Sequence, residues 1–264
     1  MNTDNTLVWG LIWDSNKINH YNDNKGFWTY INYHRLSIKK ALDLNYNCHI
    51  YISENIKEYF KDLEVIVHLV PNINSSLFDF ITNYILKSEH KNCYIIDGDV
   101  ILNKRLPDIN SNIICEQLET NVWDVLYAPY VNSLNKLNVN MKIKEWTGKK
   151  YSQLINMGIL KIKDNGFIET YLNRWDEFNS FIEEHKNELY YKSNIVNTSE
   201  YTIIGAQYLL TELLHYYKLE YLELNKINYT TNIPYYVHYM GKQKFTNGLV
   251  PYDGILKFKK LNIL

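Results

Sequence analysis

Two carboxylates separated by one glycine, Asp97-Gly98-Asp99, lie between the apolar runs 94–96 and 100–102. Side chains at positions i and i+2 of an extended segment share one face, so Asp97 and Asp99 can converge on one cation. Mg²⁺ and Mn²⁺ prefer such oxygen ligands and are usually completed by water and phosphate. Gly98 leaves room for a bulky anionic ligand beside the backbone. The stretch therefore predicts a metal site, while the alternative is a plain hairpin turn, because Asp-Gly between β-rich runs is also a strong turn signal.

The residues before this stretch alternate between apolar runs typical of buried strands and amphipathic patterns typical of helices. Such alternation predicts crossover units and a mostly parallel sheet, hence an α/β fold. In sheets of this kind, ligands bind beyond the carboxyl ends of the strands. Asp97 and Asp99 follow such an end, which favours the metal site over the hairpin. The expected strands are 7–12, 48–52, 65–70 and the run from 94, and the expected helices are 27–44, 56–60 and 77–86.

The second half of the chain has a different pattern of expected elements. Residues 123–129, 154–162 and 235–239 predict strands, and residues 167–189 predict a long helix. Asn197-Thr198-Ser199-Glu200 is typical of a helix start, with a capping side chain and a glutamate at the third helical position. A basic loop, residues 136–150, carries Lys142, Lys144, Lys149 and Lys150 around Trp146. We interpret this loop as a solvated surface segment, or as a flap on the acceptor side of a site.

Length and composition exclude several classes of protein. A chain of 264 residues is long enough for one α/β domain with a sizeable core. Its net charge of −1 argues against a grip on nucleic acid or anionic membrane over the whole surface, although a local basic patch remains compatible. No stretch approaches the ~20 apolar residues of a membrane span, and the first residues lack a signal-peptide pattern. We therefore expect a cytoplasmic protein with no membrane span.

Cysteine usage and codon-related composition add two further expectations. Cys48, Cys93 and Cys115 lack ligand-like spacing, and we interpret them as thiols in a reducing compartment, with Cys48 and Cys93 buried at strand starts. Abundant Asn, Lys, Ile and Tyr are typical of A/T-rich codons, which indicates a low-GC genome, such as that of a virus, a phage or a low-GC microbe. For a viral or phage protein, the expected location is the host cytoplasm.

Three segments resemble motifs of known glycosyltransferases. The stretch Ile95-Ile96-Asp97-Gly98-Asp99-Val100-Ile101-Leu102 resembles the DxD segment of GT-A-fold glycosyltransferases. The later His238-x-x-Gly241-x-x-Lys244 resembles the HxxGxxK motif of glycosyltransferase family 8, and Asn156-Met157-Gly158 resembles that family's Asn-x-Gly segment. The resemblance implies a single GT-A-like (Rossmann-like) domain over residues 1–264, with a mixed, mostly parallel sheet flanked by helices. Residues 1–103 would form the nucleotide-binding half with the DxD motif, and residues 104–264 the acceptor half with the HxxGxxK motif.

The same resemblance implies a function. It points to a retaining hexosyl- or pentosyltransferase that moves a sugar from a nucleotide sugar, a UDP-sugar, to a hydroxyl of a glycan or protein. Asp97, Asp99 and His238 would hold Mn²⁺ or Mg²⁺. Lys244, with Gly241, would contact the diphosphate of the donor. Asp99 is the expected bridging ligand because it lies further out along the strand.

Further residues are candidates for the donor site. The side chains of Asn156 and Gln207 are expected to bind hydroxyls of the donor sugar. Gly158, two residues after Asn156, is expected to lie in the same donor-binding segment. Glu200, the acidic residue nearest before Gln207, is a further catalytic candidate. The expected nucleoside pocket contains three residues after the first strand, namely Trp13, Asp14 and Tyr21.

Several alternatives stay open. Trp13 and Tyr21 could be core aromatics, and His238 could be a satisfied core histidine. A phage or viral enzyme that glycosylates a hydroxymethylated DNA base would use the same catalytic residues. The phosphates of the DNA would be held by the lysines of residues 136–150 and by the tail lysines Lys257, Lys259 and Lys260. An inactive sugar-nucleotide-binding module is a third possibility. A dinucleotide-dependent oxidoreductase is disfavoured because no G-x-G-x-x-G follows the first strand.

Overall fold

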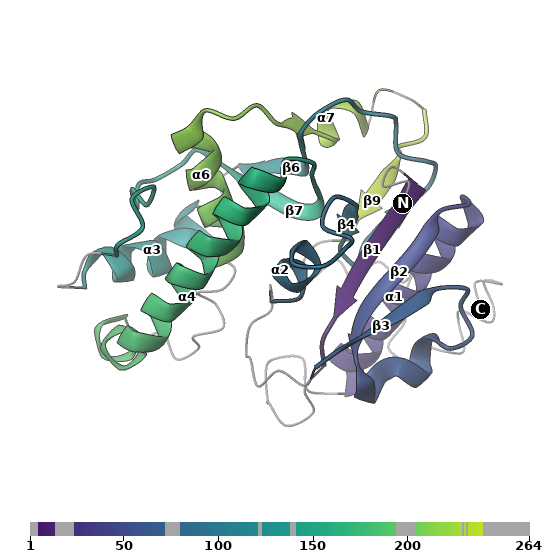
Figure 1. Cartoon of the computed structure of the whole chain (residues 1–264), viewed down its shortest axis with the longest axis horizontal. Helices are drawn as coiled ribbons and strands as arrows, with labels where there is room; N and C mark the ends of the chain where they lie inside the picture. The colour runs from purple at the N-terminus through teal and green to yellow at the C-terminus, as the bar shows by residue number, and fades with distance from the viewer. Residues whose placement is uncertain are drawn as a thin grey trace. The chain divides into compact units, whose positions relative to one another are not determined.

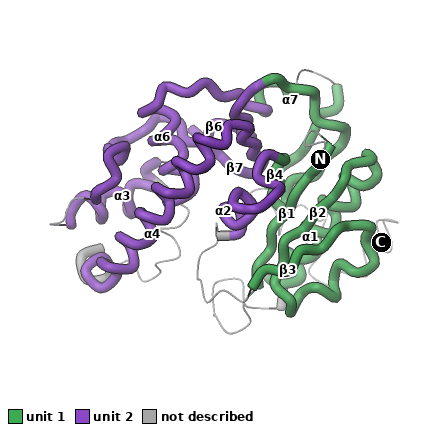
Figure 2. Tube along the Cα trace, in the orientation of Figure 1, with its two compact units in different colours: residues 1–74, 93–110, 225–264 green, residues 75–92, 111–224 purple. Residues whose placement is uncertain are grey.

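The structure, a computed structural model, describes residues 5–13, 24–71, 80–120, 123–137, 141–193, 204–228, 230 and 232–239. The chain divides into two compact units, which Figure 2 distinguishes by colour. Unit 1 comprises Met1–Asn74, Cys93–Asn110 and Asn225–Leu264. Unit 2 comprises Ser75–Asn92 and Ser111–Leu224. Each unit therefore draws on segments that are far apart in the sequence.

Unit 1 contains a parallel sheet with the strand order β3-β2-β1-β4 (Figure 1). Its core strand β1 is a continuous apolar run whose Leu7, Val8 and Trp9 are fully buried, as expected of a strand covered on both faces. Its strands are β1 (Thr6–Leu11), β2 (Asn47–Ser53), β3 (Ile66–Val70) and β4 (Tyr94–Ile96). Its helices are α1 (Asn24–Asp43), the 3-10 helix η2 (Glu54–Phe60) and α7 (Asn225–Asn228). A separate antiparallel pair joins β5 (Val100–Leu102) to β9 (Tyr236–His238).

Unit 2 is built on the strand β6 (Ile113–Thr120), which pairs antiparallel with β7 (Gln153–Ile162) and parallel with β8 (Leu222–Glu223). The long helix α4 (Asn165–Ser193) contacts the α-helices α2 (Phe80–Leu86), α3 (Ala128–Asn135) and α6 (Leu209–Tyr217) of the unit. Two π-helical turns, η3 (Trp123–Tyr127) and η4 (Ile204–Tyr208), lead directly into α3 and α6. Apolar side chains of α4, such as Tyr171 and Phe178, are fully buried.

The observed architecture confirms the predicted class, a mixed α/β fold with a mostly parallel sheet flanked by helices. The first three predicted strands and the helix 27–44 correspond closely to β1, β2, β3 and α1. The predicted strand 123–129 is wrong, because these residues form η3 and the start of α3. Short apolar runs do not distinguish strand from buried helix, and Pro129 in the first turn of α3 fits a helix start.

Strand β6 was missed because its second half, Glu116 to Thr120, carries polar and charged side chains that weaken the strand signal. Its pairing with β7 and β8, rather than its own pattern, makes it a strand. Cys48, Cys93 and Cys115 are buried, and none of the three is joined in a disulfide. None of the helices among the described residues combines the length and apolar character needed to cross a membrane.

A buried serine fastens helix α1 to two strands of unit 1. The indole Nε1 of Trp9 on β1 donates a hydrogen bond to Ser37 Oγ at 2.9 Å. Ser37 Oγ in turn donates to the carbonyl of Val100, the first residue of β5, at 2.5 Å. Ser37 is fully buried, so neither partner can replace the bond with water. The serine thereby fixes the position of β5 immediately after Asp99.

Replacing Ser37 with alanine should destabilise the fold by about 1–3 kcal/mol, because the Trp9 indole and the Val100 carbonyl would both remain buried without this partner. Chemical denaturation of wild type and S37A measures the difference. The matched control is S180A, since Ser180 is exposed on α4 and bonds only a helix carbonyl. That change should stay within about 0.5 kcal/mol. Equal stability of S37A and wild type would contradict the proposed bridging role.

Candidate functional site

Asp97 and Asp99 lie in a turn that passes the chain from one sheet to another. The amide of Val100 donates a hydrogen bond to the carbonyl of Asp97 at 3.1 Å, which closes a four-residue turn. Strand β4 before the turn pairs with β1, whereas β5 after the turn pairs with β9. The two runs around Asp-Gly-Asp are therefore not paired with each other, and the hairpin alternative is wrong. The expected extended geometry is also wrong, because the turn rather than a strand brings the two carboxylates together.

The turn places Asp99 against His238. Val100 is the register partner of His238 in the β5–β9 pair, and the amide of Tyr239 donates to the carbonyl of Asp99 at 3.1 Å. The Nε2 atom of His238 lies 3.3 Å from Oδ1 of Asp99, and the two side chains are only 8% and 9% exposed. Candidate ligand atoms of Asp97, Asp99 and His238 all lie within 4.8 Å of one another. The structure thus brings His238 together with Asp97 and Asp99, which lie far earlier in the sequence.

This arrangement suits a small divalent cation. Two ligands of one Mg²⁺ or Mn²⁺ ion lie at most about 4.2 Å apart, twice a metal–oxygen distance of about 2.1 Å. The Asp99–His238 separation of 3.3 Å lies inside that limit, and the 4.8 Å bound on the three separations exceeds it by about 0.6 Å, so small side-chain adjustments would close the site. Two carboxylates and one imidazole are also ligand types that Mn²⁺ accepts. Asp97 is exposed and Asp99 is buried, and the expected bridging role of Asp99 stays a prediction.

Strand β9, which carries His238, is held by buried contacts within unit 1. The side-chain amide of Asn228 donates to the carbonyl of Tyr236 at 3.1 Å and accepts from its amide at 3.0 Å. The Asn228 side chain thus pairs with β9 as a neighbouring peptide group would. Buried Tyr33 and Ile101 form an apolar cluster against which Tyr239 packs. The histidine therefore projects from a strand that is fixed on both sides.

A residue that the sequence did not single out, His34, fills the space beside Gly98. A Cβ atom added to Gly98 would lie 2.1 Å from Nδ1 of His34, so only glycine fits there. The same Nδ1 lies 2.8 Å from the carbonyl of Tyr30, and Nε2 lies 3.3 Å from the carbonyl of Gly10. Gly98 is thus required for packing against His34, and its predicted role in ligand access stays a prediction. No spacing rule links His34 to residue 98, so nothing in the sequence pattern indicated this contact.

Gly98→Ala should strongly destabilise the Asp97–Asp99 turn, because the added methyl group collides with a ring that is only 6% exposed. The loss should be largely relieved in the double variant G98A/H34A, since removing the imidazole removes the collision. Melting temperatures of wild type, both single variants and the double variant measure this coupling. Gly166→Ala is the control, because its added Cβ meets only one side-chain oxygen, at 3.3 Å. Additive effects of G98A and H34A would contradict the packing described.

The other candidates of unit 1 are only partly described. Trp13 follows β1, and its backbone amide donates to Ser53 Oγ at 3.1 Å at the end of β2. Its half-buried ring packs edge-to-face on Phe27 with centroids 5.0 Å apart. A nucleoside-binding role for Trp13 stays a prediction. Asp14, Tyr21, Gly241 and Lys244 lie outside the described residues, as does Glu200 of unit 2.

Asn156, Gly158 and Gln207 belong to unit 2, and their predicted roles toward a donor sugar stay predictions. Asn156 is buried in β7, where its Nδ2 donates to Glu119 at 2.7 Å and its Oδ1 accepts from the Gly158 amide at 2.7 Å. Gln207 lies in η4, and its side-chain oxygen accepts a hydrogen bond from the hydroxyl of Tyr127. Within unit 2, these side chains already organise the strand and the helical turn that carry them.

The basic loop of residues 136–150 is described at 136–137 and 141–150, and its second part is firmly attached within unit 2. The buried carboxylate of Glu212 on α6 accepts hydrogen bonds from the amides of Thr147 and Gly148, each at 3.1 Å. It also accepts from the hydroxyls of Tyr151 and Tyr208, at 2.7 and 2.8 Å. Burial, followed by this neighbouring carboxylate, raises the pKa of both tyrosines above the ordinary value, so they remain protonated donors.

A second buried carboxylate, Glu145, fastens the same loop to α4 and α6. It accepts hydrogen bonds from Arg174 Nε at 2.8 Å and from the Tyr217 hydroxyl at 2.6 Å. Burial alone would raise the pKa of Glu145, but the hydrogen bonds from Tyr217 and Arg174 outweigh burial and hold the pKa below its ordinary value. Nearby, the half-buried ring of Trp146 packs on Tyr208 at 5.0 Å. The loop is therefore an integral part of unit 2.

The lowered pKa of Glu145 predicts an acid-sensitive contribution to stability. Because the folded pKa lies below the unfolded value of about 4.3, this contribution is present above that value and is lost as pH falls through the folded pKa. Glu145→Gln should therefore lower stability at neutral pH and reduce its decline between about pH 5 and pH 3. Denaturation at a series of pH values measures both effects.

The control is Glu177→Gln, which removes the exposed partner of the same arginine. Exposed ion pairs contribute about 0–1 kcal/mol, so its pH profile should follow wild type. If E145Q and wild type lose stability in parallel on acidification, the anchoring role of Glu145 is wrong.

Comparison with known proteins gives only distant likenesses. No family model matches the chain, and neither does any curated protein. Among solved structures, PaToxG Glycosyltransferase is similar over 81% of this chain and 75% of that chain, at 13% identity and a TM-score of 0.39. The glycosyltransferase GlyE of Streptococcus pneumoniae TIGR4 is similar over 94% of this chain, at 12% identity and a TM-score of 0.42.

The apo form of GlyE is similar over 90% of this chain, at 13% identity and a TM-score of 0.43. The chain spans 57% and 54% of the two GlyE chains. With identities and TM-scores this low, function has to be inferred from the residues of the candidate site.

Proposed function

We propose that this chain is a metal-dependent glycosyltransferase that moves a sugar from a nucleotide sugar to a hydroxyl acceptor. The observation that carries the proposal is the convergence of Asp97, Asp99 and His238, whose ligand atoms lie within 4.8 Å of one another. Two of them come from a motif that resembles DxD, and the third from one that resembles HxxGxxK. A turn that only reverses the chain does not require a buried carboxylate beside a histidine of a distant strand.

The side chains have distinct roles in this proposal. Asp99 and His238, both nearly buried, form the rigid part of the metal site, and Asp97 closes it from the exposed side. Cleavage of the anomeric C–O bond leaves negative charge on the departing nucleoside diphosphate. A divalent ion held there, Mn²⁺ or Mg²⁺, would supply Lewis-acid stabilisation of that charge. Lys244 would place a further positive charge on the same phosphate oxygens.

The finer assignments extend the same proposal. The donor is a UDP-sugar, with Trp13, Asp14 and Tyr21 around the nucleoside and Gly241 beside the diphosphate. Asn156 and Gln207 orient the transferred hexose or pentose. Glu200 is a further catalytic residue. Transfer proceeds with retention, and the acceptor is a hydroxyl of a glycan or protein.

A DNA acceptor receives less support from the described lysines. Lys150 pairs with Asp124 at 2.9 Å, and Lys144 lies 3.6 Å from Glu145. Of the four lysines around Trp146 that this alternative assigns to phosphates, Lys144 and Lys150 therefore already lie beside carboxylates. The tail lysines lie outside the described residues. Lys149 also lies 5.0 Å above the ring of Tyr151. Glycan and protein hydroxyls are accordingly the acceptors to examine first.

The test combines a donor screen with a variant of the metal site. With Mn²⁺, the wild-type protein should release UDP from one sugar in a panel of UDP-sugars, and EDTA should abolish the release. Asp99→Asn should lower turnover about 10²-fold or more, because the carboxylate charge that holds the metal is lost. His238→Ala should weaken Mn²⁺ binding about 10–100-fold. Coupled nucleotide detection measures turnover, and calorimetry measures Mn²⁺ affinity.

Asp108→Asn is the matched control, because Asp108 is an exposed aspartate of unit 1 outside the ligand set. It should retain wild-type turnover and metal affinity. Circular dichroism of each variant separates loss of chemistry from loss of fold. Full activity of Asp99→Asn in the presence of EDTA would refute the metal site.

A further inference from the structure

A small cavity lies at the amino ends of the parallel strands of unit 1. Its volume is about 250 Å³, just below the roughly 300–1,000 Å³ of drug-sized ligand sites, so it fits a ligand of one ring. Among its lining residues, Asn5 precedes β1, Tyr46 precedes β2, and Tyr94 is the first residue of β4. The remaining lining residues follow β5 and are Arg105, Leu106, Pro107 and Asp108.

Arg105 brings to this cavity hydrogen-bond donors that the protein leaves unused. Its Nη1 donates to the carbonyls of Leu44 and Asn45, at 2.8 and 3.1 Å, and its Nη2 donates to Oδ1 of Asn5. These bonds use three of the five N–H groups of a guanidinium. In the described part of the chain, no acceptor takes the other two. The guanidinium is also held over the ring of Tyr46, with its carbon 4.3 Å from the ring centroid.

Asn5 and Tyr46 add further donors. Because Oδ1 of Asn5 accepts from Arg105, the amide nitrogen of Asn5 is the donor that remains. The hydroxyl of Tyr46 accepts from the amide of Leu106 at 2.8 Å, and no described residue accepts the proton of this hydroxyl or those of the Asn5 amide nitrogen. Tyr46 is only 5% exposed, and burial raises its pKa above the ordinary value, so the hydroxyl remains a donor. Buried donors are normally paired, so this one calls for an acceptor from a ligand.

We propose that this cavity binds one ring of a neutral saccharide through the donors of Asn5, Tyr46 and Arg105. The hydroxyl oxygens of a sugar carry lone pairs that can accept from all three groups. The apolar C–H groups of the ring would contact Leu106 and Pro107.

The charges around the cavity favour a neutral ligand over an ion. The guanidinium of Arg105 would repel a cation. The exposed carboxylate of Asp108, also in the lining, would repel an anion. The carboxyl end of helix α1 supplies the Leu44 and Asn45 carbonyls and adds further negative partial charge on that side. A saccharide without charge avoids each of these costs.

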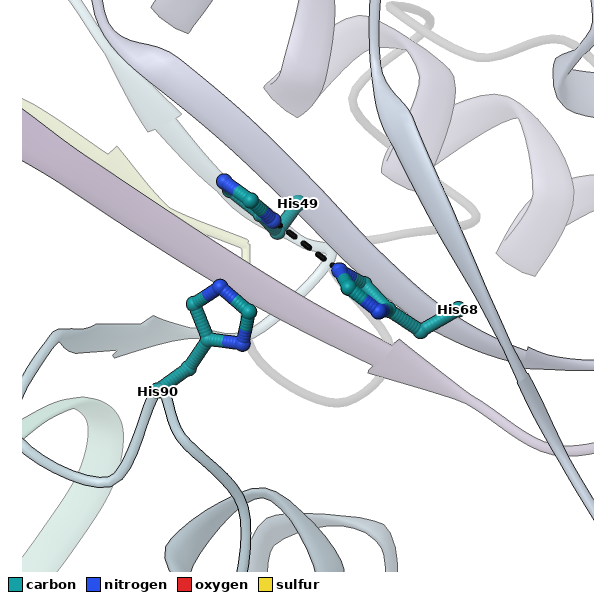
Figure 3. Close-up of side chains that lie close together, drawn as sticks. All are labelled: His49, His68 and His90. Carbon is teal, nitrogen blue, oxygen red and sulfur yellow. Dashed lines mark hydrogen bonds between the residues drawn. The ribbon is translucent and has the colours of Figure 1, made fainter. Parts of the chain in front are cut away.

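The cavity is separate from the two histidine-containing clusters of unit 1. Tyr94 of the cavity begins β4, whereas the Asp97–Asp99 turn of the candidate metal site follows the end of β4. In the other cluster, Nδ1 of His49 on β2 lies 2.9 Å from Nε2 of His68 on β3 (Figure 3), and neither residue lines the cavity. The saccharide site therefore does not depend on the proposed transferase activity.

The experiment mixes the full chain with single sugars, without metal or nucleotide, and follows binding by saturation-transfer NMR. This method detects the weak binding expected of a ligand with few atoms. The probes are D-glucose, D-galactose, D-mannose and N-acetyl-D-glucosamine, and we expect at least one of them to bind. Tyr46→Phe and Asn5→Ala should each weaken that binding about 3–10-fold, because each removes one hydrogen-bond donor. Acetate and free glycine, an anion and a zwitterion, should not bind.

The matched control is Tyr59→Phe, which removes a hydroxyl from a half-buried tyrosine of η2 outside the lining. It should bind the sugar as wild type does. Asp99→Asn should also retain sugar binding, so failure of the proposed glycosyltransferase site would leave this result unchanged. If circular dichroism shows that Tyr46→Phe does not fold, Asn5→Ala decides, because Asn5 is only half-buried.

Three results would overturn the proposal. One is that none of the four sugars binds the wild-type chain. Another is that the folded cavity variants bind the sugar as tightly as wild type does. The third is that acetate or glycine binds in place of a sugar.

Discussion

The packing of the His34 ring against Gly98 is the constraint on which the candidate site depends. The chain must leave β4, reverse, and enter β5 within three residues, and one side of that turn is filled by an imidazole from α1. Any side chain at residue 98 would push the turn away from the helix. Because Ser37 of the same helix holds the first carbonyl of β5, α1 fixes both the turn and the strand after it. The carboxylates can therefore be positioned without being part of a long strand.

The two histidine-containing clusters of unit 1 show how strand pairing brings side chains of different chemistry together. In one, the antiparallel β5–β9 register brings His238 opposite Val100 and thus beside Asp99. In the other, the parallel β2–β3 register sets His49 diagonal to His68. The first cluster carries two negative charges and suits a hard cation that also binds phosphate. The second is a pair of imidazoles whose Nδ1 and Nε2 atoms lie within hydrogen-bond distance, 2.9 Å apart.

Unit 2 uses buried carboxylates for a structural purpose. Glu145 and Glu212 lie inside the unit, and each is compensated by several donors, as a buried charge requires. Both carboxylates bind the loop around Trp146 to helices that follow it in the chain. A loop attached in this way is a fixed part of unit 2. Its lysines partly neutralise neighbouring carboxylates, which reduces the positive charge available to an anionic acceptor.

The sequence alone determined the α/β class, strands β1 to β3 and helix α1, because hydrophobic periodicity is a local property. It also indicated that Asp97, Asp99 and His238 carry side chains of metal-ligating types, because side-chain chemistry is local too. It did not determine that residues 123–129 are helical or that β6 exists, since short or partly polar segments take their structure from their neighbours. Only the tertiary structure decided that Asp99 is buried beside His238, that Gly98 packs against the His34 ring, and that His49 lies within hydrogen-bond distance of His68. Each of these contacts joins residues of different elements, and their approach depends on strand register and helix packing, which no local pattern encodes.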